Sequence, residues 1–201
     1  MKVTNHRLIN DNGAPVPYVA SPNFYSSVKP SYLIIHYTAG SNASGAINHF
    51  KAEGTASAHL VIDRDGSITQ MVPFDKGAWH AGKSKFGSVS GLNRHSIGIE
   101  LVNIGRLTKR EDGTWANWNN SISVPNSEVT VLTHKLESHP AGWHLYTQAQ
   151  LSAAVAAAQA MHAAYGFTDI LGHDDIAVPK GRKVDPGPAF NMISFRSSVI
   201  R

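Results

Sequence analysis

Short apolar runs and helical patterns alternate along much of this chain. The run at residues 32–37 is nearly continuous and rich in β-formers, which predicts a central strand buried on both faces. Ala46, Ile47 and Phe50 then recur at helical spacing up to Gly54, so a helix is expected after this strand. A strand followed by a helix is therefore the first unit that the pattern predicts.

Two further segments carry strand signals. Residues 59–62 and 68–72, each rich in apolar β-formers, flank Asp65 and Gly66. This arrangement predicts a hairpin, because glycine tolerates the positive φ that tight turns require. Residues 97–101 form another short apolar run, and Glu100 places a charge near its end. We therefore expect an antiparallel pair of strands and one more strand that ends in polar chemistry.

In the second half of the chain, a segment with little periodicity is followed by segments with clear helix and strand signals. Residues 103–146 are rich in Gly, Asn, Trp and Ser with little periodicity, which predicts a long surface excursion from the core. Thr147 and Gln150 have the spacing of a capping box, and Gly166 closes the alanine-rich segment after them, so a helix is expected there. Residues 168–171 favour a last strand and residues 192–199 a terminal helix. This order predicts an α/β fold with a mixed central β-sheet flanked by helices.

The composition suits one globular domain over residues 1–201, with 42% hydrophobic residues. The chain has no cysteine, which excludes disulfides, iron–sulfur clusters, thiolate zinc sites and cysteine nucleophiles. Its formal net charge of +4 favours contact with anionic polymers such as bacterial envelope components. Because Lys and Arg form no run interleaved with aromatic residues, nucleic acid is not the predicted partner.

No segment predicts a membrane span or secretion by a signal peptide. The longest apolar stretch, residues 153–164, is mostly alanine and is interrupted by Gln159 and His162. Residues 1–7 lack the apolar core of a signal peptide. We therefore expect synthesis in the cytoplasm. A monomer is the default expectation for the oligomeric state.

Three residues far apart in the chain have the chemistry of an open zinc site. His36 ends the run at residues 32–37, and His173 follows the last predicted strand. An imidazole buried at a strand end costs free energy unless its nitrogens find partners. Asp185 lies in a turn with Pro186, Gly187 and Pro188, whose restricted dihedral angles fix the direction of the carboxylate. Two imidazoles and one carboxylate leave a fourth position for a nucleophilic water.

Two charged residues are candidates for the chemistry at such a metal. Glu100 would act as general base beside zinc, and its structural alternative is an exposed carboxylate at a strand end. Lys183 would stabilise an oxyanion, and its structural alternative is a solvated surface lysine. In a strand, the spacing of Lys183 and Asp185 would place both side chains on one face.

Other histidines invite competing interpretations. Trp79 and His80 form a compact aromatic and imidazole patch on a predicted loop, where Trp79 is equally a core residue or a substrate platform. His59 is expected to be a structural, hydrogen-bonded residue. A second cluster in the excursion could imitate a metal site, but we expect no metal there because no predicted strand or helix fixes its geometry; its members are His134, Glu137, His139 and His144.

Seven short motifs, in order through residues 32–190, resemble the zinc N-acetylmuramoyl-L-alanine amidases, a family that shares its fold with the peptidoglycan recognition proteins. The motifs are Ile34-Ile35-His36, Ser57-Ala58-His59-Leu60-Val61-Ile62 with Asp65-Gly66, Val72-Pro73-Phe74-Asp75-Lys76, Ala78-Trp79-His80-Ala81-Gly82, Ser96-Ile97-Gly98-Ile99-Glu100-Leu101, Gly172-His173-Asp174-Asp175-Ile176-Ala177 and Gly181-Arg182-Lys183-Val184-Asp185-Pro186-Gly187-Pro188-Ala189-Phe190. The resemblance implies the peptidoglycan recognition protein-like amidase fold.

The same resemblance implies roles for individual residues. His36, His173 and Asp185 would bind zinc, Glu100 would be the catalytic acid and base, and Lys183 would stabilise the transition state. The family cleaves the amide between the lactyl group of N-acetylmuramic acid and the L-alanine of the stem peptide. Stretches that resemble the family's substrate-binding loops contain Trp79, His80 and Asn93.

Departures from the family pattern bear on the substrate. Short phage amidases and animal relatives carry a tyrosine and a cysteine where this chain has Ala58 and Asp185, so it resembles the bacterial branch that uses Glu and Asp. The excursion at residues 103–146 is longer than in minimal cytosolic recycling enzymes. A longer loop and a basic charge favour polymeric peptidoglycan over small anhydro-muropeptides. The physiological role stays open between a phage lysis enzyme, which would act on the cell wall after release through a pore, and a cytosolic recycling enzyme.

Two other function classes compete with the amidase hypothesis. A non-catalytic peptidoglycan-binding recognition module would keep the fold and bind stem peptides, and loss of one metal ligand typically marks such modules. A metallohydrolase that acts on some other amide would keep the ligands. The complete ligand set, His36, His173 and Asp185, favours an enzyme over a recognition module.

Overall fold

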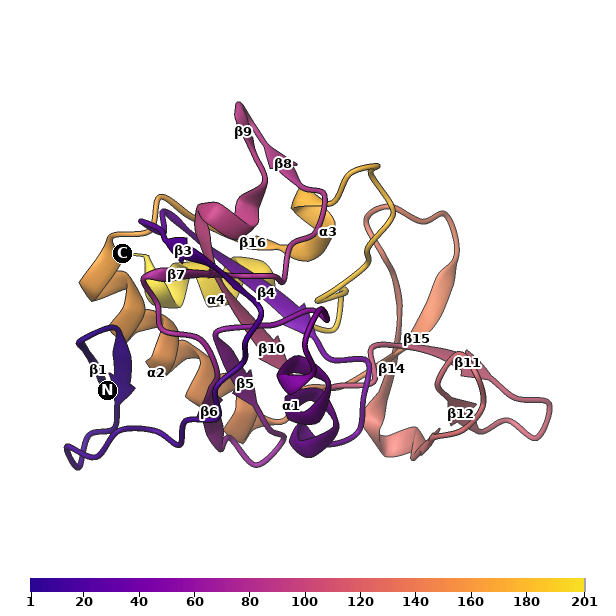
Figure 1. The fold of residues 1–201 in the computed structure, drawn as a ribbon. Coiled ribbons are helices and arrows are strands. Elements are labelled where there is room, and N and C mark those ends of the chain that lie inside the picture. The colour runs from indigo at the N-terminus through magenta and orange to yellow at the C-terminus, as the bar shows by residue number, and fades with distance from the viewer. Residues whose placement is uncertain (201) are drawn as a thin grey trace.

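The computed structural model describes residues 1–200. The core of the protein is built around a five-stranded mixed sheet (Figure 1). Its strand order is β16-β4-β10-β5-β6. β16, β4, β10 and β5 run parallel, and β6 pairs with β5 in the antiparallel direction. The strands are β4 (Tyr32–Tyr37), β5 (Leu60–Ile62), β6 (Ile68–Gln70), β10 (Ser96–Leu101) and β16 (Asp169–Gly172). The predicted mixed central sheet is thereby confirmed.

β4 lies between β10 and β16 at the centre of the parallel part, as its continuous apolar run predicted. The predicted hairpin is β5 with β6, in the register Ile62 opposite Ile68. Gly66 in its turn has a φ of +88°, a conformation that residues with a Cβ rarely adopt. The turn packs closely on a helix, because a Cβ at Gly66 would lie 2.9 Å from the Ala149 carbonyl oxygen.

Helices cover both faces of the central sheet. α2 (Gln148–Tyr165) and α4 (Met192–Val199) pack on one face, where the core includes Leu33, Ile35 and Phe195. α1 (Ala43–Lys51) and the short α3 (His173–Ile176) cover different parts of the other face (Figure 1). Side chains alternate along a strand, so His36 points to the face opposite Leu33 and Ile35. The flanking helices agree with the predicted α/β class.

The predicted alanine-rich helix is α2, and its cap departs from the expected capping box. Thr147 Oγ accepts from the backbone N–H of Gln150 at 3.1 Å, as expected. The Gln150 side chain, however, donates to the carbonyls of Ile62 and Val102, each at 3.0 Å. Because Gln150 is wholly buried, its amide ties the helix to the ends of two sheet strands rather than closing the cap. Gly166 ends the helix in the left-handed conformation.

The excursion at residues 103–146 has regular structure, although its composition and lack of periodicity predicted an irregular loop. It folds into a second, five-stranded antiparallel sheet in the order β13-β12-β11-β15-β14, which projects from one side of the core (Figure 1). Its strands have only two to five residues, so a periodic signal is hard to detect. They are β11 (Arg106–Lys109), β12 (Trp115–Ala116), β13 (Ser123–Val124), β14 (Val129–Thr133) and β15 (Pro140–His144).

The remaining elements are short and lie around the core. Strands β1 (Lys2–Thr4) and β2 (Arg7–Ile9) form a hairpin whose turn places Asn5 and His6 at positive φ. The other pairs are β3 (Phe24–Ser27) with β7 (Lys76–Ala78) and β8 (Lys85–Phe86) with β9 (Val89–Ser90). Two 3-10 helices span Leu92–Arg94 and Asn126–Glu128.

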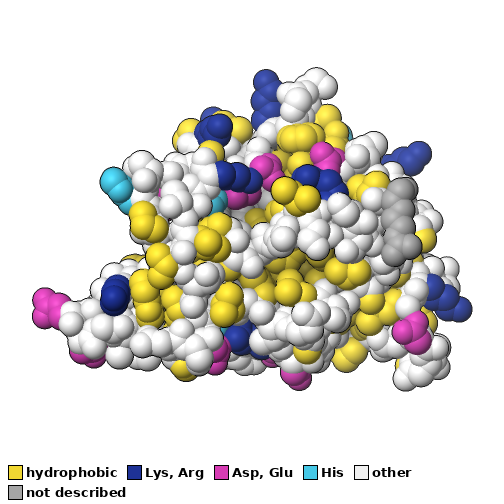
Figure 2. Space-filling model, turned by 180° about the vertical axis from the view of Figure 1, so that it is seen from behind, with side chains coloured by type: hydrophobic (Ala, Val, Ile, Leu, Met, Phe, Trp, Pro, Cys, Tyr) yellow, Lys and Arg dark blue, Asp and Glu magenta, His cyan; other side chains and the backbone are white. Residues whose placement is uncertain are grey.

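Surface and helix properties bear on the expected partners. In the view from behind, Lys and Arg side chains are scattered among acidic, apolar and neutral groups rather than joined into one patch (Figure 2). No helix within residues 1–200 has both the length and the apolar character needed to span a bilayer.

Candidate metal centre

Three separate elements deliver the predicted metal ligands to one point at the carboxyl end of the parallel strands. His36 comes from β4, and His173 is the first residue of α3, directly after β16. Asp185 lies on the irregular segment before α4, and its carbonyl accepts from the Asp174 N–H at 2.9 Å. Ligands of parallel α/β sheets commonly bind at this edge. Gly172 permits the approach, because a Cβ there would clash with the Asp174 carboxylate.

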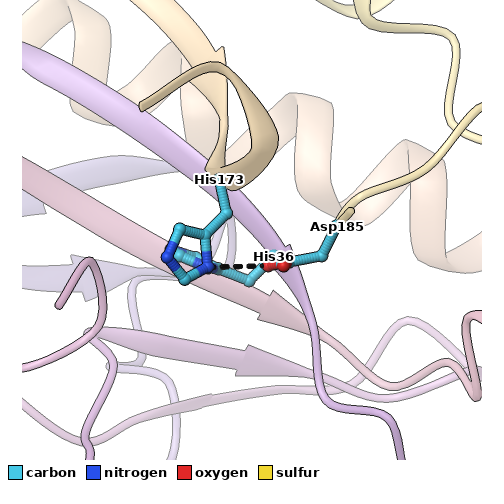
Figure 3. A group of neighbouring side chains, drawn as sticks. All are labelled: His36, His173 and Asp185. Carbon is cyan, nitrogen blue, oxygen red and sulfur yellow. Dashed lines mark hydrogen bonds and ion pairs between the residues drawn. The ribbon is translucent and has the colours of Figure 1, made fainter. Parts of the chain in front are cut away.

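The side chains of His36, His173 and Asp185 converge on one point (Figure 3), and the three distances between their ligand atoms are equal, so that these atoms form a triangle. His36 Nδ1, His173 Nδ1 and Asp185 Oδ2 lie 3.0 Å from one another in all three pairs. Three ligand atoms of a tetrahedral zinc ion, with bonds of about 2.0–2.1 Å, lie about 3.3 Å apart. All three residues are buried. The set fits a small divalent cation, and no other group of this kind occurs among the described residues.

Burial and the neighbouring groups together set the protonation of His36 and Asp185. Burial, and next the neighbouring His173, lower the pKa of His36 to about 4 against a partial opposing effect of Asp185. Burial opposes ionisation of Asp185, but the two imidazoles facing it outweigh burial and hold its pKa below the usual range. A neutral imidazole and an ionised carboxylate are the forms that bind metal ions.

Glu100 lies beside this triangle by strand register. It is directly opposite His36 in the parallel pair of β10 and β4, so both side chains project from the same face. Its Oε2 atom is buried without a hydrogen-bond partner. Burial, and next the charge of Asp185, raise the pKa of Glu100 to about 8, while Lys183 acts in the opposite direction. A carboxyl group with this pKa exchanges a proton near neutral pH.

Lys183 lies close enough to the site for its charge to act on both Glu100 and His36. It is half-buried on the irregular segment that carries Asp185, and not in a strand. The strand geometry considered for Lys183 and Asp185 is therefore absent, although the segment brings both residues to the site.

The loop after β7 carries Trp79 and His80, and the 3-10 helix Leu92–Arg94 carries Asn93, the third expected substrate-binding residue. His80 and Asn93 are buried, whereas Trp79 is partly exposed. Asn93 Oδ1 accepts from the backbone N–H groups of His80 and Ala81 at 3.0 and 2.6 Å. Trp79 packs against Tyr25 with ring centroids 5.6 Å apart. The hydrogen bonds of His80 and Asn93 are to protein groups, so their contact with a substrate stays a prediction.

His59 occupies the structural position that its sequence context predicted. It directly precedes β5 and is wholly buried. Its Nδ1 accepts from the Gly98 N–H at 2.9 Å, and its Nε2–H donates to the Lys76 carbonyl at 2.8 Å. Both ring nitrogens therefore have protein partners, and burial lowers the pKa of His59 to about 4.

The residues of the second histidine cluster have separate partners, although regular structure does hold this region. His134 pairs with Asp174 at 2.8 Å, Glu137 pairs with Arg106 at 2.8 Å, and His144 Nε2 lies 3.1 Å from Glu128. The expectation that no regular element fixes this region was wrong, since His144 lies in β15. The His134–Asp174 pair connects the excursion sheet to the residue after the ligand His173.

Several residues that shape the centre were not predicted from the sequence, and only one of them had a sequence signal that could have identified it. Tyr146 donates its hydroxyl to the Pro186 carbonyl at 2.8 Å, next to Asp185. Ser96 Oγ lies 3.2 Å from His80 Nε2. Gly98 gave the one usable signal, because an isolated glycine inside a strand marks a close approach. A Cβ at Gly98 would lie 2.5 Å from the His80 ring.

Two cavities adjoin the segment that follows His173. One of about 390 Å³ is lined by residues that include His134, Asp174 and Pro186. The other, of about 620 Å³, shares Asp174 and also includes Lys85 and Lys180. Both therefore lie next to residues that are adjacent in sequence to metal ligands.

Known proteins match most of this chain. Residues 26–188 match the family model described as N-acetylmuramoyl-L-alanine amidase. The 1,6-anhydro-N-acetylmuramyl-L-alanine amidase AmpD of Escherichia coli strain K12 is 35% identical over 145 residues, which cover 71% of this chain and 58% of that protein. The matched part is thus less than two thirds of the length of this curated relative.

Solved structures share the fold. A selenomethionine derivative of AmpD has a TM-score of 0.64 at 28% identity, with 99% of each chain covered. AmpDh3 from Pseudomonas aeruginosa, solved in complex with anhydromuramic pentapeptide, has a TM-score of 0.61 at 26% identity, with 95% of this chain and 66% of that chain covered. The amidase fold expected from the sequence motifs is thereby confirmed.

Proposed function

We propose that this chain, which belongs to the N-acetylmuramoyl-L-alanine amidase family, hydrolyses the amide bond between the lactyl group of N-acetylmuramic acid and L-alanine. The observation that carries the proposal is the buried triangle of His36, His173 and Asp185, whose ligand atoms lie 3.0 Å apart. A triangle of this size and chemistry beside a carboxylate with a buried, unpartnered oxygen suits metal-assisted hydrolysis.

We infer that the resident metal is zinc. Nitrogen and carboxylate oxygen ligands in a three-residue set are typical of catalytic zinc sites, which keep one position open. When bound, zinc would supply Lewis acidity at the scissile carbonyl and would lower the pKa of a bound water. His36, His173 and Asp185 would hold the ion; burial keeps His36 neutral, and the two imidazoles that face Asp185 keep its carboxylate ionised.

The chain's own residues would handle the proton and the developing charge. Glu100 shares a face with His36, and its free Oε2 atom can accept a proton from the attacking water. The same carboxyl would return that proton to the L-alanine nitrogen as the amide bond breaks. Lys183 would stabilise negative charge on the carbonyl oxygen, since its ammonium group already acts electrostatically on Glu100.

For the substrate we favour small anhydro-muropeptides over polymeric peptidoglycan, contrary to the preference drawn from the long excursion and the basic charge. The E. coli relative is named for the 1,6-anhydro sugar, and the Pseudomonas relative was solved with an anhydromuramic pentapeptide. The excursion also packs on the segment that carries Asp185, which gives its length a structural explanation. A small soluble substrate suits action within the producing cell.

The test compares one zinc-loaded protein preparation on two substrates. We expect the protein to cleave a purified anhydro-muropeptide faster than intact sacculi. The quantity compared is the rate, per mole of enzyme, at which new L-alanine amino termini are exposed. A reversed preference would restore the polymeric substrate. Tight binding of muropeptide without turnover would replace the enzyme with a recognition module, and turnover of unrelated acyl-peptides alone would indicate a different amidase.

A further inference from the structure

A chain of hydrogen bonds leads outward from the metal ligand His36. Its Nε2 atom lies 2.9 Å from His80 Nδ1, and His80 Nε2 lies 3.2 Å from Ser96 Oγ. The Ser96 hydroxyl in turn lies 2.6 Å from the Leu92 carbonyl oxygen. His36, His80 and Ser96 are all buried, so protein groups decide the direction of each bond.

The Leu92 carbonyl fixes that direction. A carbonyl oxygen only accepts, so the single hydroxyl proton of Ser96 is committed to Leu92. Ser96 Oγ is then an acceptor for His80 Nε2–H, which leaves the neutral His80 with an unprotonated Nδ1. That Nδ1 accepts from His36 Nε2–H. The proton of neutral His36 is therefore on Nε2, and its Nδ1 lone pair faces Asp185 and His173.

His80 is held firmly enough to select one tautomer of its neighbour. Its ring lies against Gly98, where a Cβ would be 2.5 Å away. Its backbone N–H donates to Asn93 Oδ1 at 3.0 Å. The His36 and His80 rings meet edge to face, with centroids 5.0 Å apart and planes at 83°. The ring can neither rotate freely nor move away from His36.

The same loop orients the second imidazole. His173 Nε2 lies 3.2 Å from the Ala81 carbonyl, which can only accept, so neutral His173 also has its proton on Nε2. The Ala81 N–H donates to Asn93 Oδ1, the atom that holds His80. Two adjacent loop residues thus direct two unprotonated Nδ1 atoms toward the ionised Asp185. Three acceptors in such proximity repel one another unless a cation lies between them.

We propose that His80 is a positioning residue that holds His36 in its Nε2-protonated tautomer, so that the metal site has its ligand lone pairs in place before the metal binds. The inference rests on the proposed zinc site and extends it to a residue outside the ligand set. Its competitor is the tautomer in which His36 Nδ1–H donates to Asp185 Oδ2, 3.0 Å away. That tautomer would have to lose its proton before zinc could bind.

Ring-nitrogen NMR on the metal-free protein distinguishes the two tautomers directly. In long-range ¹H–¹⁵N spectra we expect His36 with a protonated Nε2 and an unprotonated Nδ1 in the parent chain. In His80→Phe, which keeps a ring but removes the acceptor, the Nδ1-protonated form should increase. A parent chain with His36 protonated on Nδ1 would overturn the proposal, whether or not the protein is an active enzyme.

Zinc affinity, measured by competition with a chromophoric chelator, gives the second readout. Loss of a group that orients a metal-bound histidine typically weakens metal binding by about 10–100-fold, and we expect this for His80→Phe. His80→Asn keeps an acceptor near the Nδ1 position and should remain within about threefold of the parent chain. Ser96→Ala should fall between the two, because it removes only the outer bond that orients His80.

The outcomes separate this inference from the proposed function. A parent chain that binds no zinc would refute the metal site itself. A parent chain that binds zinc tightly, with His80→Phe equally tight, would refute only the role of His80. Circular dichroism and thermal unfolding of each metal-free variant identify loss of fold, and Ser96→Ala and His80→Asn keep the test decisive if His80→Phe does not fold.

Discussion

At the scale of single residues, the site is built from polar groups whose nearest partners are one another. A buried imidazole or carboxylate without a partner costs free energy. His36, His173 and Asp185 satisfy this requirement with three mutual contacts of 3.0 Å. Glu100 is the exception, since its Oε2 atom is buried with no partner. This unpartnered oxygen beside the triangle is the reason we propose Glu100 as the group that moves a proton.

Replacing Glu100 with Gln should abolish most of the activity and leave the metal in place. The amide keeps the size of the side chain but cannot accept the proton of an attacking water, so kcat should fall by about 10²–10⁴-fold. Product release from a muropeptide, followed by chromatography, measures the rate, and zinc analysis measures the metal. Glu111→Gln, at an exposed turn, is the matched control and should retain full activity. A Glu100→Gln enzyme with near-parental kcat would remove Glu100 from the mechanism.

The clustering of His36, His173 and Asp185 could be predicted from the sequence because each is a polar residue that apolar neighbours or prolines hold in place. His36 and His173 directly follow apolar runs, and Asp185 precedes Pro186. Ser96 and Asn93 could not be predicted in this way. A small polar residue near a strand or in a loop has many uses, and only strand register and loop packing bring these two to His80.

At the scale of elements, the excursion sheet supports the segment that carries Asp185. Trp143 in β15 packs so closely on Gly187 that a Cβ there would lie 2.5 Å from the indole ring. Gly187 also has a φ of +73°, so two independent constraints require glycine at this position. Together with the bond from Tyr146 to Pro186, this contact links the second sheet to the metal centre.

Truncation of Trp143 should therefore destabilise the protein strongly. The side chain is 1% exposed, and loss of a buried Trp typically costs about 3–5 kcal/mol. Trp118 is 80% exposed in the same excursion, and Trp118→Ala should change the free energy of unfolding by less than about 0.5 kcal/mol. Urea unfolding of both variants in EDTA measures the difference. Similar losses in the two variants would show that the excursion sheet does not depend on this contact.

The elements of the core were predictable and those of the excursion were not. Buried strands such as β4 have continuous apolar runs, and α2 begins and ends at recognisable caps. The strands of the second sheet are short, and β14 lies at its edge with Val131 54% exposed. Edge strands with little burial place few demands on residue type. Their pairing depends on contacts across the sheet, which a local pattern does not contain.

At the scale of the whole molecule, the buried histidines couple stability to pH. Burial lowers the pKa of His59 from its ordinary 6.5 to about 4 in the folded protein. Between these values the unfolded chain binds a proton that the folded chain does not, so stability is complete above pH 6.5 and falls as the pH decreases toward 4. The shift corresponds to about 3 kcal/mol for this one side chain.

Unfolding of the EDTA-treated protein at a series of pH values tests this coupling. His59→Gln should be less stable than the parent chain at about pH 7 but should lose less stability between pH 6.5 and 4, because it has no imidazole to protonate. His139→Gln, at an exposed position, should leave the parental pH profile unchanged. If His59→Gln loses stability on acidification as steeply as the parent chain, other groups cause the acid sensitivity.

The fold as a whole places the chemistry at the carboxyl ends of parallel strands, and the identity of the broken bond is the central claim. The most direct measurement is mass spectrometry of the products formed from an anhydro-muropeptide in H₂¹⁸O by the zinc-loaded protein. We predict one ¹⁸O atom in the lactyl carboxylate of the sugar product and an unlabelled peptide that begins with a free L-alanine amino group. Cleavage at any other bond, or no cleavage by protein shown to contain zinc, would contradict it.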